Sequence, residues 1–228
     1  MKIQQINYNF IDLSNNKKLM NYYFLSSSFT KHILDEINSG FYREEAFDKI
    51  FNKNHENIVI DIGAHIGLFS LYIEPYCKKI YVIEPSPSHF DILNEITRTK
   101  DKIIAFNFAV SNYDGECSFF IDNGNTTMNR ICHSEPESCK VKCKNLYSFL
   151  KQNNIDEIDL LKIDIEGGED LVILQNDKLK DILKICKNLY LEIHYDNQKP
   201  YIDKILSLKE YKIVPSSKLW MGVYFLEK

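Results

Sequence analysis

The sequence has no long apolar run. Nowhere in its 228 residues do about 18 uncharged apolar residues follow one another, so no membrane-spanning helix is expected. The N-terminal segment also lacks the apolar stretch of a signal peptide. These two absences predict a cytoplasmic protein without a membrane span.

A surplus of positive charge is also missing. Lys and Arg number 28 against 32 Asp and Glu, which gives a formal net charge of −4. Proteins that bind nucleic-acid phosphates favour a basic face, so this balance disfavours nucleic acid as a partner. We expect a small-molecule or glycan acceptor instead, and whether the chain forms a homodimer stays open.

The six cysteines lack the paired C-x2-C spacing of a structural zinc site. Because no secretion signal is present, we expect free thiols and not disulfides. The one local cluster is Cys132, His133, Cys139 and Cys143. Cys139, Val141 and Cys143 alternate with lysines, which indicates the buried face of a strand and disfavours zinc.

The hydrophobic pattern changes at residue 57. Residues 1–56 place apolar residues at helical spacing and predict an N-terminal helical cap, which either packs on the core or forms a lid over a substrate. Residues 57–228 predict one α/β domain, because short apolar runs typical of strands buried on both faces alternate with amphipathic helices. The predicted strands are 58–62, 79–84, 103–110, 159–164 and 188–193.

Three local features complete the expected fold. Ser86 and Pro87 are expected to begin a helix, as its cap and its first residue. Residues 211–215 and 221–228 have no room for a helix between them, so they predict a hairpin and an antiparallel final strand. Residues 112–150 hold two alternating runs around a polar loop, which predicts a strand-rich insertion. We therefore expect a Rossmann-like, mostly parallel sheet of seven strands.

The turn after the first strand predicts a ligand site. Gly63 permits a tight turn, with Ala64 after it, and Gly67 permits close approach in the first turn of the helix. Asp61 is placed to face a cationic amino group and would repel a pyrophosphate. The spacing is not G-x-G-x-x-G, which counts against an NAD-dependent oxidoreductase.

The ends of the next two strands extend this predicted site. Glu84 ends the second strand, followed by Pro85, and an acid there can accept both ribose hydroxyls of an adenosine. Asn107 and Ala109 close the third predicted strand and are candidates to border the adenine.

The fourth and fifth strands also end in polar residues. Alternation places Lys162 and Asp164 on one face of the fourth strand, and Glu192 and His194 on one face of the fifth. If the strands are neighbours, these groups converge at the carboxyl edge of the sheet, where open α/β folds bind ligands. We interpret Glu169 as a charge at the start of a helix. For Lys162 and Glu192, the alternative to a role in ligand binding is a structural ion pair.

These segments resemble the FkbM-like family of S-adenosylmethionine (SAM) dependent methyltransferases. VIDIGAHIG, VIEPSP, FAVSNYDG, DLLKIDIEGGE and LEIH occur in the order and spacing of that family, over roughly residues 42–195. The resemblance implies a class I methyltransferase fold with SAM as cofactor. It implies SAM contacts at Asp61, Gly63, Gly67 and Glu84, with Asp164 beside the transferred methyl group.

The resemblance also implies an acceptor class, because such enzymes typically O-methylate sugars or polyketide-sugar products. We expect O-methylation of a hydroxyl on a saccharide or nucleotide-sugar, as in surface glycan biosynthesis. A non-sugar acceptor and an NAD-dependent Rossmann oxidoreductase are the alternatives. A base-methylating enzyme is disfavoured, since Asp-Ile-Glu-Gly stands where such enzymes carry an Asn/Asp-Pro-Pro-aromatic run.

The transfer needs a group that takes a proton. A sugar hydroxyl is too weakly acidic to ionise at neutral pH, so a base or a metal must assist. His194, with an ordinary pKa of about 6.5, can be neutral and act as the base, and Asp164 is the second candidate. Asp164 and Glu166 offer oxygens that can hold Mg²⁺, but two carboxylates underspecify a metal site. We therefore favour metal-free catalysis, with Lys162 completing the catalytic set.

Overall fold

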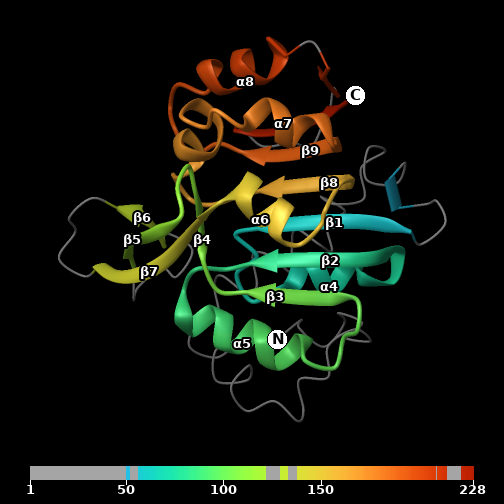
Figure 1. The fold of residues 1–228 in the computed structure, drawn as a ribbon, viewed down its shortest axis with the longest axis vertical. Coiled ribbons are helices and arrows are strands. Elements are labelled where there is room, and N and C mark those ends of the chain that lie inside the picture. The colour runs from blue at the N-terminus through green and yellow to red at the C-terminus, as the bar shows by residue number, and fades with distance from the viewer. Residues whose placement is uncertain (1–49, 52–55, 122–128, 133–137, 209, 215–221) are drawn as a thin grey trace, which may run out of the picture.

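The computed structural model describes residues 50–51, 56–121, 129–132, 138–208, 210–214 and 222–228 (Figure 1). The predicted helical cap at 1–56 lies outside the described residues, apart from the buried helical pair Ile50 and Phe51 and the exposed Glu56. None of the described helices is long and apolar enough to cross a membrane.

The core of the domain is a seven-stranded sheet in the order β10-β11-β9-β8-β1-β2-β3. The five strands from β9 to β3 are parallel, while β11 runs antiparallel to both β9 and β10. This arrangement confirms the predicted mostly parallel sheet with an antiparallel C-terminal hairpin. The strands are β1 (Asn57–Ile62), β2 (Cys77–Ile83), β3 (Ile103–Phe106), β8 (Ile158–Ile163), β9 (Cys186–Glu192), β10 (Lys212–Ile213) and β11 (Val223–Glu227).

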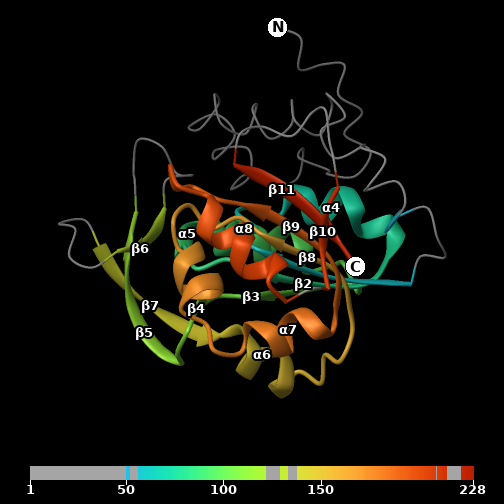
Figure 2. The same ribbon diagram turned by 90° about the horizontal axis from the view of Figure 1, so that it is seen from above.

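Helices cover both faces of the sheet, because successive strand residues point to opposite sides. Val59 and Leu160 pack into one core with α4 and α5. Ile60 and Leu161 pack into a second core with α6, α7 and α8. Figure 2 shows α4 on the opposite side of the sheet from α6 and α7. The helical segments are α4 (Leu68–Ile73), η3 (Glu74–Tyr76), α5 (Pro87–Thr97), α6 (Leu146–Gln152), the π-helical turn η4 (Asp170–Leu174), α7 (Leu179–Lys184) and α8 (Lys199–Leu206).

The start of α5 differs in detail from the prediction. Pro87 is its first residue and Ser86 precedes it, as expected. The Ser86 side chain makes no capping hydrogen bond. Its hydroxyl lies 3.2 Å from that of Ser88, so the two serine side chains pair with each other.

The predicted strand 103–110 is wrong as a single strand. The chain leaves the main sheet after Phe106, and Ala109 begins a strand that pairs in parallel with Cys143 of a second sheet. This insertion sheet has the order β4-β7-β5-β6 and lies beyond the carboxyl ends of the parallel strands (Figure 1). Its strands are β4 (Ala109–Ser111), β5 (Gly115–Phe120), β6 (Arg130–Cys132) and β7 (Ser138–Asn145), followed by α6, which the sequence did not predict.

The cysteines of the insertion sheet form part of a small core. Cys117, Val141 and Cys143 are buried, and the half-buried Cys139 packs against them, while Lys140 is exposed. The predicted buried face of this strand is therefore confirmed. All six cysteines are free thiols. His133, the remaining member of the local cluster, lies outside the described residues.

Candidate active site

A cavity of about 180 Å³ opens at the carboxyl edge of the sheet, between the ends of β1, β2 and β8 and the insertion sheet. Three loops after parallel strands converge here, as expected for an open α/β fold. Most of the predicted site residues line it, namely Asp61, Gly63, Ala64, Glu84, Pro85, Ala109, Lys162, Asp164 and Glu166.

Gly63 is fixed by a close backbone approach. Its φ is 79°, and a side chain there would place Cβ 1.6 Å from the carbonyl oxygen of Asp164. The amides of Gly63 and Ala64 both donate to the Ile83 carbonyl, at 3.0 and 3.1 Å. These two amides hold the turn against β2, so they are not available to donate hydrogen bonds to a ligand.

Two predicted cofactor residues, Gly67 and Asn107, shape the walls of the site and do not line the cavity. A Cβ at Gly67 would lie 2.5 Å from Leu93 of α5, so helix packing requires the glycine. Asn107 donates to the carbonyls of Glu84 and Pro85, at 2.8 and 3.1 Å. Asn107 therefore supports the turn that carries Glu84.

Glu84 is buried and rigidly held at the end of β2. Its two carboxylate oxygens accept the backbone amides of His65 and Ser86, at 2.8 and 2.9 Å. His89 Nδ1 lies 3.6 Å away, and the His89 ring packs edge-on against His65. Burial, with the charges of His89 and Lys162, holds the pKa of His65 well below its ordinary value. The site thus presents a fixed carboxylate beside a neutral imidazole.

Asp61, Lys162 and Asp164 form a charged row across two neighbouring strands. Asp61 and Lys162 are register partners in the β1–β8 pair, and Lys162 Nζ lies 3.4 Å from Asp61 and 3.1 Å from Asp164. Asp61 is fully buried and accepts a hydrogen bond from Ser70 at 2.7 Å. Its other oxygen, Oδ1, has no hydrogen-bond partner among the described residues. Burial raises the pKa of Asp61, although Lys162 and Ser70 oppose this shift.

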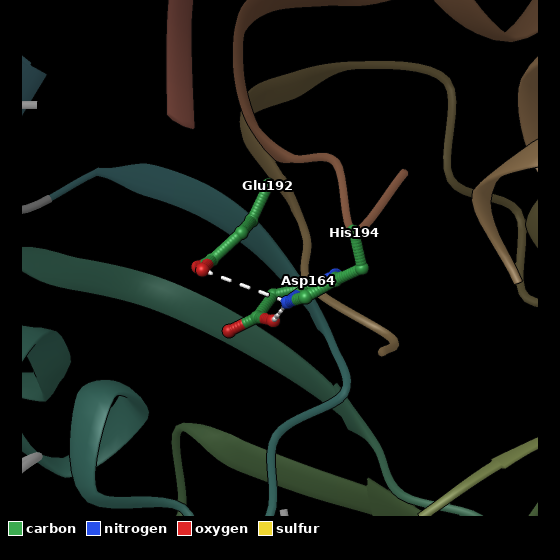
Figure 3. Close-up of side chains that lie close together, drawn as sticks. All are labelled: Asp164, Glu192 and His194. Carbon is green, nitrogen blue, oxygen red and sulfur yellow. Dashed lines mark ion pairs between the residues drawn. The ribbon is translucent and has the colours of Figure 1, made fainter. Parts of the chain in front are cut away.

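His194 lies among four carboxylates. Its Nδ1 is 2.8 Å from Glu169, while Nε2 is 3.5 Å from Glu166, 3.6 Å from Glu192 and 3.9 Å from Asp164 (Figure 3). Burial alone would lower the pKa of His194. The hydrogen bonds to Glu169 and Glu192 and the charges of Glu166 and Asp164 overcome burial and raise it to about 11. The surrounding carboxylates therefore favour the protonated ring over the neutral base that we expected.

Glu166 and Glu169 follow Asp164 in the turn after β8. Glu166 has a φ of 55°, a strained conformation for a residue with a side chain. Burial, together with Asp164, Glu192 and Glu169, raises the Glu166 pKa to about 7. Glu169 is fully buried against His194, so its interpretation as a helix-start charge is wrong.

The sequence reasoning missed several wall residues. His65 lies within the VIDIGAHIG motif and His89 in the first turn of the helix that begins at Pro87, but neither was assigned a role. Phe119 belongs to the alternating run of β5, and its inward position follows from that pattern. Other residues of the wall that were not predicted are Leu68, Phe69, Phe108, Val110, Ile131, Ile165 and Gly168.

Residues 61–212 match the family model of the methyltransferase FkbM domain. Methyltransferase sdnD of Sordaria araneosa is 25% identical over 238 residues, spanning 88% of this chain and 89% of that protein. An rRNA methylase of Streptococcus thermophilus has a TM-score of 0.48 at 12% identity, covering 79% of this chain and 92% of that one. Fibrillarin of Aeropyrum pernix, solved with S-adenosyl-L-methionine, has a TM-score of 0.45 at 9% identity, covering 77% and 66%.

The match to the family model covers more than half of the chain and includes the cavity-lining residues from Asp61 to Glu192. It sets aside the alternative of an NAD-dependent oxidoreductase. The chain belongs to the FkbM methyltransferase family and is a SAM-dependent methyltransferase.

Proposed function

We propose that this enzyme transfers a methyl group to a hydroxyl of a saccharide. A nucleotide-sugar is a second acceptor within this class. The observation that carries the proposal is the composition of one cavity wall, where Asp164, Glu166 and Glu192 lie together. Carboxylate oxygens accept hydrogen bonds from sugar hydroxyls. Phe108 and Phe119 line the same cavity and supply apolar surface for the C–H face of a sugar ring.

The residues at the ends of β1 and β2 fit SAM. Asp61 offers a buried carboxylate whose Oδ1 makes no close hydrogen bond and has Lys162 Nζ 3.4 Å away, which suits a further cationic group such as the amino group of the cofactor. Glu84 offers a rigid carboxylate for the ribose hydroxyls. When bound, SAM supplies a sulfonium methyl group, whose S–C bond breaks as the new O–C bond forms.

The protein itself must orient the acceptor and take its proton. Lys162 holds Asp164 at 3.1 Å and so fixes one carboxylate at the lip of β8. Asp164 and Glu166 are the candidate proton acceptors, and the raised pKa of Glu166 brings it closer to the neutral range where a base works best. His194, being protonated, serves as a charged partner of these acids and not as the base.

Methyl transfer from labelled SAM to a panel of acceptors tests this proposal. The panel should contain neutral oligosaccharides, nucleotide-sugars, catechols and amines, with the methylated atom assigned by NMR. We expect O-methylation of a saccharide, and neutral sugars to react better than nucleotide-sugars, because the acidic wall repels a diphosphate. Transfer to an amine or catechol, with no saccharide modified, would overturn the proposal.

A further inference from the structure

Three acids converge on one nitrogen, Nε2, of His194. The distances from Nε2 to Asp164, Glu166 and Glu192 are 3.5–3.9 Å, at or beyond the limit of a hydrogen bond. Ligand atoms of one cation bound at about 2.1 Å lie roughly 3 to 4.2 Å apart. One ligand atom each from Asp164, Glu192 and His194 lie within 4.8 Å of one another, a limit slightly above that range. Figure 3 shows the three side chains converging.

A second observation concerns the other side of the imidazole ring. Nδ1 lies 2.8 Å from Oε1 of Glu169, whose side chain is fully buried. A histidine that binds a metal through one nitrogen characteristically donates the other N–H to a carboxylate, which orients the ring. The second oxygen of Glu169 has no hydrogen-bond partner among the described residues. Glu169 therefore fixes the ring so that Nε2 points at the three acids.

The balance of charge also favours a bound cation. Besides the four carboxylates around His194, the same cavity edge holds Asp61. Among the described residues, ion pairs within 4 Å link these five acids to Lys162 and His194. Glu169 and Asp61 are fully buried and Lys162 nearly so. An excess of negative charge in a partly buried site is costly unless a cation compensates it.

We propose that Asp164, Glu192 and His194 bind one divalent cation of the Mn²⁺ or Mg²⁺ class at the wall of the cavity. Carboxylates with one imidazole suit such ions, and the three residues occupy one side of the coordination sphere. Asp164 and Glu192 line the cavity, so the remaining positions face the space where an acceptor binds. Glu166, 3.5 Å from His194 Nε2, lies beside the site.

A cation at this site would also restrict which acceptors can bind, an inference that rests on the proposed function. A cation with several open positions binds two neighbouring oxygens of one ligand, as a sugar with adjacent hydroxyls offers. A hydroxyl bound to the cation loses its proton more readily, and Glu166 beside the site would accept that proton. Binding of the cation displaces the proton from Nε2 of His194, while Nδ1 keeps its proton toward Glu169.

Binding of Mn²⁺ to the full-length protein, stripped of metal by chelation, tests the site directly. Electron paramagnetic resonance should show one Mn²⁺ per chain, and Mg²⁺ added in excess should displace it if the natural ion is the harder one. Glu192→Gln and His194→Ala should each weaken Mn²⁺ binding at least about tenfold, and Glu169→Gln by roughly 10–100-fold through the ring orientation. Exposed Glu116→Gln and Asp156→Asn are matched controls and should bind as the parent protein does.

Thermal unfolding of each variant separates lost binding from lost folding. No stoichiometric Mn²⁺ binding by the parent protein, or unchanged affinity in folded Glu192→Gln and His194→Ala, would overturn the site and leave a closed network of ion pairs. Loss of turnover with EDTA, restored by Mn²⁺, would support the role in acceptor binding. Full turnover in EDTA would overturn that role. Stoichiometric Mn²⁺ binding without methylation of any saccharide would support the site while contradicting the proposed acceptor class.

Discussion

Gly63 and Asp164 lie on neighbouring strand ends so close together that the Asp164 carbonyl oxygen fills the space of any side chain at position 63. Asp164 also donates its own amide to the Ile62 carbonyl, at 3.1 Å. The turn after β1 and the acid at the end of β8 are therefore one rigid unit. A change in the turn displaces Asp164 as well.

Gly63→Ala is expected to be severely destabilising. The positive φ costs a residue with a side chain about 1–3 kcal/mol, and the overlap with a backbone oxygen adds to it. We expect a loss of at least about 3 kcal/mol in the free energy of unfolding, measured by urea denaturation. Gly168→Ala is the matched control, because its Cβ would meet only side chains, the nearest at 3.1 Å. That variant should change stability by no more than about 1 kcal/mol, and equal losses in both would contradict the assignment.

Glu84→Gln should weaken SAM binding by roughly 1.5–3 kcal/mol, the scale of charge-assisted hydrogen bonds. The amide keeps the size of the side chain but turns one acceptor oxygen into a donor, which faces the backbone amide of His65 or Ser86. Isothermal titration calorimetry with SAM and its demethylated product measures the loss. Glu95→Gln, exposed on α5, is the control. SAM affinity unchanged in a folded Glu84 variant would rule out the ribose assignment.

Asn129→Ala is expected to affect the acceptor and spare the cofactor. Asn129 is buried and lines the cavity from the segment just before β6, while Asp61 and Glu84 line it from the ends of β1 and β2. We expect the KM for the saccharide to rise roughly tenfold, the cost of about one hydrogen bond, with an unchanged Kd for SAM. Asn94→Ala on the exposed side of α5 should change neither quantity. A weakened SAM affinity with an unchanged acceptor KM would refute this division of the cavity. Asn125 and Thr126, in the polar loop of the insertion, lie outside the described residues.

The buried cysteines should resist alkylation in the native protein. Burial raises the pKa of Cys77 and of Cys117 to about 12 and that of Cys186 to about 11. Since a raised pKa keeps the thiol protonated below that pH, raising the pH from 8 to 9.5 creates almost no reactive thiolate at these positions. Iodoacetamide labelling followed by mass spectrometry should find the half-buried Cys139 modified, and these three only after unfolding. Equal labelling of Cys77 and Cys139 in the native state would contradict the burial.

The features that could be predicted from the sequence are those encoded locally. Strand and helix periodicity, the glycine turn and the short link before the final strand each lie within a few residues, so the seven-stranded sheet followed from them. The division of residues 103–110 did not, because Ala109 leaves the main sheet to pair with Cys143. That partner is 34 positions away in the chain, and no local pattern marks the change.

The candidate site was predictable to the same degree. The positions of Asp61, Glu84 and Asp164 follow from where parallel strands end, and all three line the cavity. The protonation of His194 and the burial of Glu169 could not be predicted in this way. Each depends on the other residue, which is 25 positions away in the chain. A charge at a helix start looks the same in sequence whether solvent or an imidazole faces it.

The separate hydrogen bonding of the insertion sheet has a consequence for how this enzyme diversifies. The strands from β4 to β7 pair only with one another among the described residues, and they pack around a small core of their own. We therefore expect that the chain from β5 to β7 can be exchanged for that of another family member without altering the register of the seven-stranded sheet, whereas Phe108, Val110 and α6 belong to the main core. Such an exchange would replace the wall that bears Phe119 and Asn129 and keep the one that bears Asp61 and Glu84. We expect such an exchange to change acceptor choice while sparing SAM binding.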